Sequence, residues 1–372
     1  MKVKHIIALY FLSFLLIILN SCAIKSVFLG RPDNKDLKRF KNTTIKKGET
    51  CFEFKQDANT ENASLMIEDW TRDIPFFMPI DTFAETHKIR SFLVIQNDSI
   101  KYQYYDDRLN ENDLHSSYSV AKSFTSALIG IAIDEGIIKS EQDLVVDYLN
   151  ELKDIPHATK LTIEHLLNHT SGIQYSLITD AIIYYGDNSM NALKKIKFED
   201  LPGTKQHYLN INIQLLGIIL RRVTGVSVSN YLQEKIWKPI QMCSDALWSV
   251  DKKNGLEKTY CCLGASALDY AKFGRLYLNK GMWEDERVIS ESWYNKSIKR
   301  DTTGGSSFNY NYCWYIGLKE YGDFMAIGLY KQHIYINPKK NLIIVLFNDN
   351  EKPLKAERVN WWHIFRQIAD QL

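Results

Sequence analysis

The sequence is poor in the residues that break or cross-link a chain. Its 372 residues include 8 prolines, 18 glycines and 6 cysteines. Proline and glycine are too rare for a collagen-like or low-complexity chain, and 12% aromatic residues exclude extensive disorder. Six cysteines in this length are not a disulfide scaffold, and a chain this long buries a sizeable core without one. The composition is that of an ordinary folded protein.

An excess of charge of one sign is also lacking. Lysine and arginine number 46 against 44 acidic residues, which leaves a net charge of +2. Binding to a phosphate backbone needs clustered cations, so we expect no nucleic-acid partner.

Several catalytic motifs are absent. There is no Gly-x-Ser-x-Gly turn of the α/β-hydrolases, no glycine-rich phosphate loop and no His-Glu-x-x-His zinc helix. His165 and His169 share a helical spacing, and we interpret them as structural. We therefore expect neither a metal nor a cofactor.

One long apolar run is present, at the N-terminus. Lys2 and Lys4 precede residues 6–19, a run that is short for a membrane span of about 20 residues. The pattern suits a signal peptide, and its end, Leu19-Asn20-Ser21-Cys22, resembles the bacterial lipobox. We expect residues 1–21 to be removed and Cys22 to be lipidated. The alternative is an uncleaved anchor helix. Both place the protein in the cell envelope, on the periplasmic or outer-membrane face.

The five cysteines after Cys22 show no metal-binding spacing. Their odd number leaves at least one unpaired, and the adjacent Cys261 and Cys262 are awkward to bridge. We interpret the five as mostly buried small apolar residues.

The distribution of strands and helices predicts the fold class. Residues 22–79 are polar and are expected to form a tether and lead-in, and regular patterns begin near Ile80. Strands are predicted near both ends and helices between them, which favours an α/β (α+β) fold over a doubly wound parallel one. We expect an antiparallel sheet built from both termini, flanked by helices, with an inserted mainly helical subdomain in residues 80–372. The predicted hairpin covers residues 90–95 and 100–105, the late strands 333–336 and 342–347, and the helices 81–87, 119–138, 265–278 and 355–372.

The sequence Ser119-Val120-Ala121-Lys122 carries a possible catalytic pair. Side chains three apart on a helix lie on one face, and negative charge is stabilised in a first helical turn. A buried lysine loses its proton easily and can then activate a serine hydroxyl. The motif alone is weak, because Ser249-Val250-Asp251-Lys252 matches it too.

The surrounding motifs make the first match specific. Leu166-Leu167-Asn168-His169-Thr170-Ser171-Gly172 and Tyr208-Leu209-Asn210 follow it in order. From about residue 80 onward this arrangement closely resembles the serine β-lactamase-related family. That family includes class C β-lactamases, D-alanyl-D-alanine carboxypeptidases, family VIII esterases and 6-aminohexanoate-dimer hydrolases.

The resemblance implies a role for each matched residue. Ser119 is the expected nucleophile and Lys122 its activating partner. Tyr208 is the expected general base and then general acid, and Asn210 orients the Ser–Lys pair or the substrate amide. The N–H of Ser119 supplies one oxyanion donor. Tyr175 occupies the position of a substrate-contacting tyrosine in the amide-hydrolysing members.

The third family element, a Lys/His-Thr-Gly segment, departs from the pattern. Aligned with residues 329–331, its glycine becomes Lys331, and its cation is lost. True β-lactamase activity is therefore doubtful, while the N–H of Gln332 can still complete the oxyanion hole. Lys331 either binds an acidic substrate group or points into solvent.

Together these features predict a membrane-tethered serine hydrolase that cleaves an ester or amide of a small or peptide-like substrate. Two alternatives stay open: a non-catalytic lipoprotein that binds the cell wall or another ligand, and a D-Ala-D-Ala carboxypeptidase. The sequence does not indicate the oligomeric state.

Overall fold

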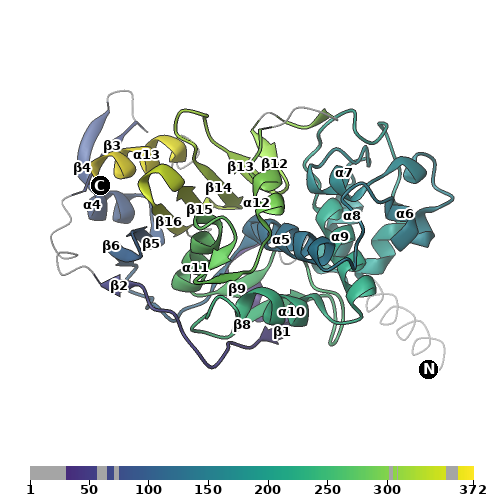
Figure 1. The fold of residues 1–372 in the computed structure, drawn as a ribbon, viewed down its shortest axis with the longest axis horizontal. Helices are drawn as coiled ribbons and strands as arrows, with labels where there is room; N and C mark the ends of the chain where they lie inside the picture. Colours follow the sequence, from purple (N-terminus) through teal and green to yellow (C-terminus); the bar gives the residue numbers. More distant parts are fainter. Residues whose placement is uncertain (1–30, 57–64, 71–74, 301–304, 308, 349–358) are drawn as a thin grey trace, which may run out of the picture.

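The computed structural model describes residues 31–56, 65–70, 75–300, 305–307, 309–348 and 359–372. The predicted signal peptide and Cys22 lie outside these residues. Within them, a sheet covered by helices forms one half of the molecule and a mainly helical region forms the other (Figure 1).

A large sheet organises the first half. Its strand order is β12-β13-β14-β15-β16-β5-β6-β2, and every pair is antiparallel except β2 with β6. The C-terminal strand β16 pairs with the early strand β5, which confirms that both ends of the chain build one sheet. The strands are β2 (Lys55–Gln56), β5 (Ile89–Gln96), β6 (Ser99–Tyr105), β12 (Tyr310–Asn311), β13 (Trp314–Ile316), β14 (Phe324–Gly328), β15 (Gln332–Asn337) and β16 (Leu342–Asn348).

The two faces of this sheet contribute to two apolar cores. Successive side chains in a strand point to opposite faces. In β5, Leu93 and Ile95 join the larger core, whereas Phe92 and Val94 join the smaller one. The helices α5 (Ala121–Asp134) and α11 (Ala267–Leu278) pack in the larger core, and α4 (Ile80–Thr86) and α13 (Trp361–Gln371) pack in the smaller one.

The helical region lies between β6 and β8 (Ala246–Val250) in the chain, as the predicted insertion requires. Helix α5 connects it to the sheet, and 12 of the 14 residues of α5 are buried. Apart from Lys122, the buried residues of this helix are apolar or small, which allows it to be packed on every side. The other helices of the region are α6 (Val145–Tyr148), α7 (Ile163–Leu167), α8 (Leu177–Tyr185), α9 (Asn210–Thr224) and α10 (Val228–Leu232).

The segment expected as a tether takes part in the fold. Strand β1 pairs with β8, which extends a smaller sheet of order β1-β8-β9-β7, and β2 extends the large sheet. The folded unit thus begins well before residue 80. The remaining elements are β1 (Lys41–Ile45), β3 (Met66–Asp69), β4 (Phe76–Pro79), β7 (His115–Ser116), β8 (Ala246–Val250), β9 (Leu263–Ala265), β10 (Met282–Trp283), β11 (Glu286–Arg287), α3 (Asp36–Arg39) and α12 (Glu291–Ser297).

Two predicted helices are shorter than expected. The helix expected at residues 119–138 opens with a 3-10 turn, Tyr118–Val120, and α5 ends at Asp134. The last helix begins at Trp361, and residues 349–358 lie outside the described part. Among the described residues no single helix has the length and apolar character of a membrane span. A bent pair, Asn210–Thr224 with Val228–Trp237, meets those criteria only when taken together.

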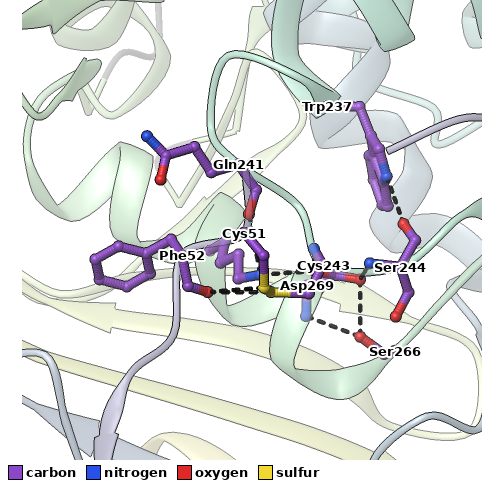
Figure 2. Close-up of polar contacts among 9 residues, drawn as sticks. Cys51, Phe52, Trp237, Gln241, Cys243, Ser244, Ser266 and Asp269 are labelled. Carbon is purple, nitrogen blue, oxygen red and sulfur yellow. Dashed lines mark hydrogen bonds and ion pairs between the residues drawn. A yellow bond between two sulfur atoms is a disulfide. The ribbon is translucent and has the colours of Figure 1, made fainter. Parts of the chain in front are cut away.

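The interpretation of the five cysteines as mostly buried holds for Cys261, Cys262 and Cys313, and Cys313 is the expected unpaired one, but the other four form disulfides. Cys51 is bonded to Cys243, and Figure 2 shows this disulfide beside Phe52 and Asp269. The bond joins residues 192 positions apart, a pairing that spacing in the sequence does not reveal.

The adjacent Cys261 and Cys262 are also bonded to each other, which corrects the expectation that they are awkward to bridge. Among the described cysteines, Cys313 is the free thiol, and it is buried.

Candidate active site

Ser119 lies at the junction between the small sheet and the helical region. It occupies the 3-10 turn Tyr118–Val120, immediately before α5. Tyr118 has a φ of 43°, in the left-handed region. Ser117 anchors the turn, because its N–H donates to the Leu263 carbonyl at 2.7 Å and its Oγ accepts from the Leu263 N–H at 3.1 Å. The nucleophile predicted from the sequence therefore sits on a fixed turn at a helix N-terminus.

Lys122 meets Ser119 as the Ser-x-x-Lys spacing predicts. The lysine is 1% exposed, and its Nζ donates to Ser119 Oγ at 2.8 Å. The same Nζ donates to Asn210 Oδ1 at 3.0 Å and to the Tyr260 carbonyl at 2.9 Å. Three hydrogen-bond acceptors hold the amine in place. They therefore fix the end of the otherwise flexible lysine side chain beside Ser119.

Burial also changes the chemistry of this amine. Desolvation lowers the pKa of Lys122 to about 7, although the thiol of Cys313 and the carboxylate of Asp180 act to raise it. At neutral pH a large fraction of Lys122 is therefore a neutral amine, which can accept a proton.

Asp180, which the sequence analysis missed, belongs to this cluster. It lies on α8, where burial raises the pKa of its carboxyl group, and it accepts a hydrogen bond from the Asn210 side chain. Asn210 thus connects Asp180 to Lys122. No local motif marks Asp180, because its charge acts on Lys122 only once the tertiary fold has brought α8 and Asn210 together.

Tyr208 lies next to both members of the Ser119–Lys122 pair. It is hydrogen-bonded to Ser119, and Lys122 Nζ lies 4.9 Å from its ring centre. The residue is 44% exposed as a whole, and desolvation is the largest cause that raises the pKa of Tyr208 well above its ordinary value. The phenol is therefore protonated at neutral pH and is placed to donate a proton.

The segment from Leu166 to Gly172 holds the backbone on both sides of Tyr208. The His169 carbonyl accepts from the His207 N–H at 2.8 Å, and His169 Nδ1 accepts from the Leu209 N–H at 3.2 Å. This role agrees with the interpretation of His169 as a structural residue. Gly172 has a φ of 71°, and a side chain there would meet the Asp200 carbonyl at 2.2 Å, so only glycine fits.

The third family element differs from the alignment expected from the sequence. Residues 329–331 form the turn between β14 and β15, and Lys331 has a φ of 66° there. The glycine that lies close to the nucleophile's segment is Gly328, where a Cβ would meet the Ser117 carbonyl at 2.5 Å. The close approach thus occurs at the end of β14, not at Lys331.

The other predicted site residues lie farther out. Tyr175 is 53% exposed, and partial desolvation and, secondly, the charge of Asp180 raise the pKa of its hydroxyl group. Gln332 is buried and exchanges hydrogen bonds with the Asn348 backbone through its side chain. The oxyanion role of Gln332 and the substrate role of Lys331 stay predictions.

Two further features lie outside this cluster. Glu199, Asp200 and His207 bring possible metal-ligand atoms within 4.8 Å of one another, but they are partly exposed and we assign no metal to them. A cavity of about 1100 Å³ is lined by residues such as Asp33, Arg90 and Asn348, and it does not include Ser119.

Comparison with known proteins agrees with this arrangement. The family model described as Beta-lactamase matches residues 84–368, so the chain belongs to the beta-lactamase family. The 6-aminohexanoate-dimer hydrolase of Paenarthrobacter ureafaciens is 25% identical over 281 residues, which cover 68% of this chain and 71% of that protein.

Solved structures confirm the β-lactamase/transpeptidase-like fold. A putative 6-aminohexanoate-dimer hydrolase from Bacillus anthracis superposes with a TM-score of 0.78 at 25% identity, over 89% of this chain and 90% of that one. A family VIII carboxylesterase gives a TM-score of 0.63 at 16% identity, over 79% and 95% of the two chains, and supports the fold alone. The chain is a serine hydrolase of this family, of the esterase or amidase type.

Proposed function

We propose that this protein hydrolyses an ester or amide bond of a small or peptide-like substrate through an acyl-Ser119 intermediate. The observation that carries the proposal is the 2.8 Å contact between Ser119 Oγ and a buried Lys122 amine with a pKa of about 7. This is a nucleophile and a base in direct hydrogen-bond contact.

The first half-reaction forms the acyl-enzyme. Ser119 Oγ attacks the substrate carbonyl carbon while its proton passes to the neutral Lys122 amine. The carbonyl oxygen gains the negative charge, which the N–H of Ser119 and the proposed second donor, the N–H of Gln332, stabilise. When the tetrahedral intermediate collapses, the bond to the leaving group breaks, and Tyr208 donates a proton to the departing oxygen or nitrogen. The ammonium of Lys122 returns a proton to Tyr208.

The second half-reaction releases the acid. Water attacks the acyl carbonyl and gives a proton to the neutral Lys122. The ester bond to Ser119 Oγ then breaks, and that oxygen takes the proton from the Lys122 ammonium, which restores the free enzyme. This scheme uses Lys122 as the base and Tyr208 as the acid, since the phenol is protonated at neutral pH.

The substrate class follows from the relatives and the altered third element. Two relatives are named for hydrolysis of the 6-aminohexanoate dimer. No lysine or histidine stands in residues 326–328, at the end of β14, so the cation that grips a β-lactam carboxylate is missing there. We propose short linear esters or amides as substrates, with β-lactams hydrolysed poorly.

We further propose that Cys22 is lipidated and tethers the enzyme to a membrane of the cell envelope. The apolar run at residues 6–19 and the lipobox-like sequence that follows support this location. Metabolic labelling with a palmitate analogue tests it, with Cys22→Ser as the control. An unlabelled wild-type protein would contradict the tether and leave the hydrolase proposal intact.

The hydrolase proposal is tested with a substrate panel. p-Nitrophenyl esters, the 6-aminohexanoate dimer, a D-Ala-D-Ala peptide and the β-lactam nitrocefin are assayed side by side, and fluorophosphonate labelling reports the nucleophile. We expect ester and linear amide hydrolysis, with both hydrolysis and labelling abolished in Ser119→Ala. Equal reactivity of wild type and Ser119→Ala would exclude the proposal and favour a non-catalytic binding protein. Preferred cleavage of the D-Ala-D-Ala peptide would indicate a carboxypeptidase instead.

A further inference from the structure

We propose that the disulfide between the adjacent Cys261 and Cys262 is a positioning element of the active site, because it fixes the backbone carbonyl that holds Lys122. This inference rests on the proposed function, and it assigns a role to two residues that the Ser–Lys–Tyr mechanism does not use.

The segment that contains this disulfide lies along the first turns of α5. In residues 258–263, the Tyr260 carbonyl accepts from Lys122 Nζ at 2.9 Å. One residue earlier, the Thr259 carbonyl accepts from Thr125 Oγ1 at 2.8 Å. Consecutive carbonyls of one segment therefore hold consecutive turns of the helix that carries the catalytic lysine.

The same segment also holds the nucleophile's turn. Leu263 exchanges two hydrogen bonds with Ser117, which is two residues before Ser119. Cys261 and Cys262 lie between Tyr260 and Leu263. The disulfide thus occupies the stretch of backbone that joins the contact to Lys122 with the contact to the Ser119 turn.

A disulfide between neighbours closes a small ring that includes their peptide bond and removes torsional freedom from it. Cys262 has a φ of 65°, in the left-handed region that residues with a side chain rarely adopt. Trp248 Nε1 donates to the Cys261 carbonyl at 2.9 Å, and the Cys261 N–H donates to the Lys258 carbonyl at 2.9 Å. Without the ring, position 262 can relax toward negative φ, which turns the peptides on either side of Cys262. The Tyr260 carbonyl lies one peptide further along, and we expect it to be displaced through the backbone of Cys261.

Loss of that carbonyl changes two properties of Lys122. The amine loses one of the three acceptors that hold it beside Ser119. A carbonyl acceptor also favours the ammonium form, so its removal lowers the pKa of Lys122. The other titratable groups that face Lys122 stay in place: Asp180 on α8, Cys313 between β12 and β13, His169 and Tyr208 on the loops before α8 and α9, and Tyr260 itself.

The first test compares two double variants of the full chain. Cys261→Ser/Cys262→Ser removes the adjacent disulfide, and Cys51→Ser/Cys243→Ser removes the other one as the matched control. We expect kcat for a p-nitrophenyl ester to fall about tenfold in the first variant, the rate change that one lost hydrogen bond of ordinary net strength produces. KM should stay close to wild type, and the acid limb of the pH profile should move to lower pH. The control should keep the wild-type kcat and pH profile.

The second test removes the bond without mutating Cys261 or Cys262. In the Cys51→Ser/Cys243→Ser protein, dithiothreitol gives two electrons and two protons to the Cys261–Cys262 disulfide and closes to its own cyclic disulfide. Mass spectrometry after alkylation follows the two new thiols. Reduction should reproduce the slower kcat and the shifted acid limb, and reoxidation should reverse both.

Several outcomes would overturn the inference. Alkylation of Cys261 and Cys262 in unreduced, denatured wild type would show that the bond is absent. Wild-type kcat and pH profile in the Cys261→Ser/Cys262→Ser variant would show that the bond does not position Lys122. If that variant does not fold, unchanged kinetics of the reduced control protein would show the same. Fluorophosphonate labelling separates the two proposals, because a wild type that is not labelled at Ser119 contradicts the proposed function itself.

Discussion

His169 and Tyr208 lie ring against ring, with 4.3 Å between the ring centres. His169 also holds the backbone on both sides of Tyr208, through its carbonyl to His207 and through Nδ1 to Leu209. Burial lowers the pKa of His169 well below its ordinary value, so the ring is neutral and acts through packing and hydrogen bonding. This histidine therefore sets where the phenol of Tyr208 stands.

Replacement of His169 tests this positioning role. His169→Ala should lower kcat by about tenfold, as expected when a hydrogen bond and a ring contact are lost, with little change in KM. His169→Asn keeps a side-chain acceptor and should recover part of the loss. Because His169 is neutral, the acid limb of the pH profile should stay in place in both variants. His165→Ala, which changes a helix cap on the same segment, is the control and should keep wild-type kcat.

The pH dependence of kcat/KM should report Lys122. The reaction needs the neutral amine, so activity is present above the pKa of Lys122, about 7, and falls toward tenfold per pH unit below it. Asp180→Asn removes a negative charge that raises this pKa, so its acid limb should lie at lower pH than that of wild type. A limb that moves to higher pH in Asp180→Asn would contradict the assignment of the limb to Lys122.

Tyr208→Phe should remove the proton donor while the ring contact with His169 remains. We expect ~10²–10⁴-fold lower kcat for an amide substrate, the usual contribution of a positioned acid–base group, with KM near wild type. Tyr105→Phe is a suitable control, because the buried Tyr105 hydroxyl has no hydrogen-bond partner among the described residues. Turnover of Tyr208→Phe near that of the control would place proton donation elsewhere, with Lys122 as the remaining candidate.

The catalytic pair could be predicted from the sequence because Ser119 and Lys122 are close together in the chain. A spacing of three on a helix brings Ser119 and Lys122 to one face whatever surrounds them. The alternating and helical patterns likewise predicted the hairpin of β5 and β6 and the late strands β15 and β16.

Contacts between distant segments could not be predicted in this way. The charge of Asp180 acts on Lys122 only in the folded chain, and the sulfurs of Cys51 and Cys243 likewise meet only there. Strand β1 was missed because its residues, Lys41 to Ile45, include only one buried apolar side chain. The alignment of the third element was wrong for a related reason. Gly328 lies against Ser117 at the end of β14, and this position is set by the pairing of β14 with β15. No local triplet of residues marks it in the sequence.

Lys122 should also make stability depend on pH. Its pKa is about 7 in the folded protein and about 10.4 when unfolded. Between these values the unfolded chain binds more protons, so the folded state gains stability as pH rises, by up to about 1.4 kcal/mol per pH unit. Lys122→Met should lose activity and lack this dependence. Urea unfolding of both proteins at pH 7.5 and 9 measures the difference, and parallel pH dependences would show that Lys122 keeps an ordinary pKa in the folded state.

Gly328→Ala should show that the end of β14 must lie close to the nucleophile's segment. The added Cβ would meet the Ser117 carbonyl at 2.5 Å, a backbone atom that cannot move aside without shifting the turn that carries Ser119. We expect the kcat of an ester substrate to fall by at least tenfold, because small displacements of a reacting group cost large factors in rate. Gly48→Ala is the matched control, since its Cβ would meet its nearest neighbours at an ordinary 3.6 Å. Lys331→Gly is the third member of the set: if residues 329–331 were the functional triplet, this change would raise activity, whereas an element centred on Gly328 predicts no gain.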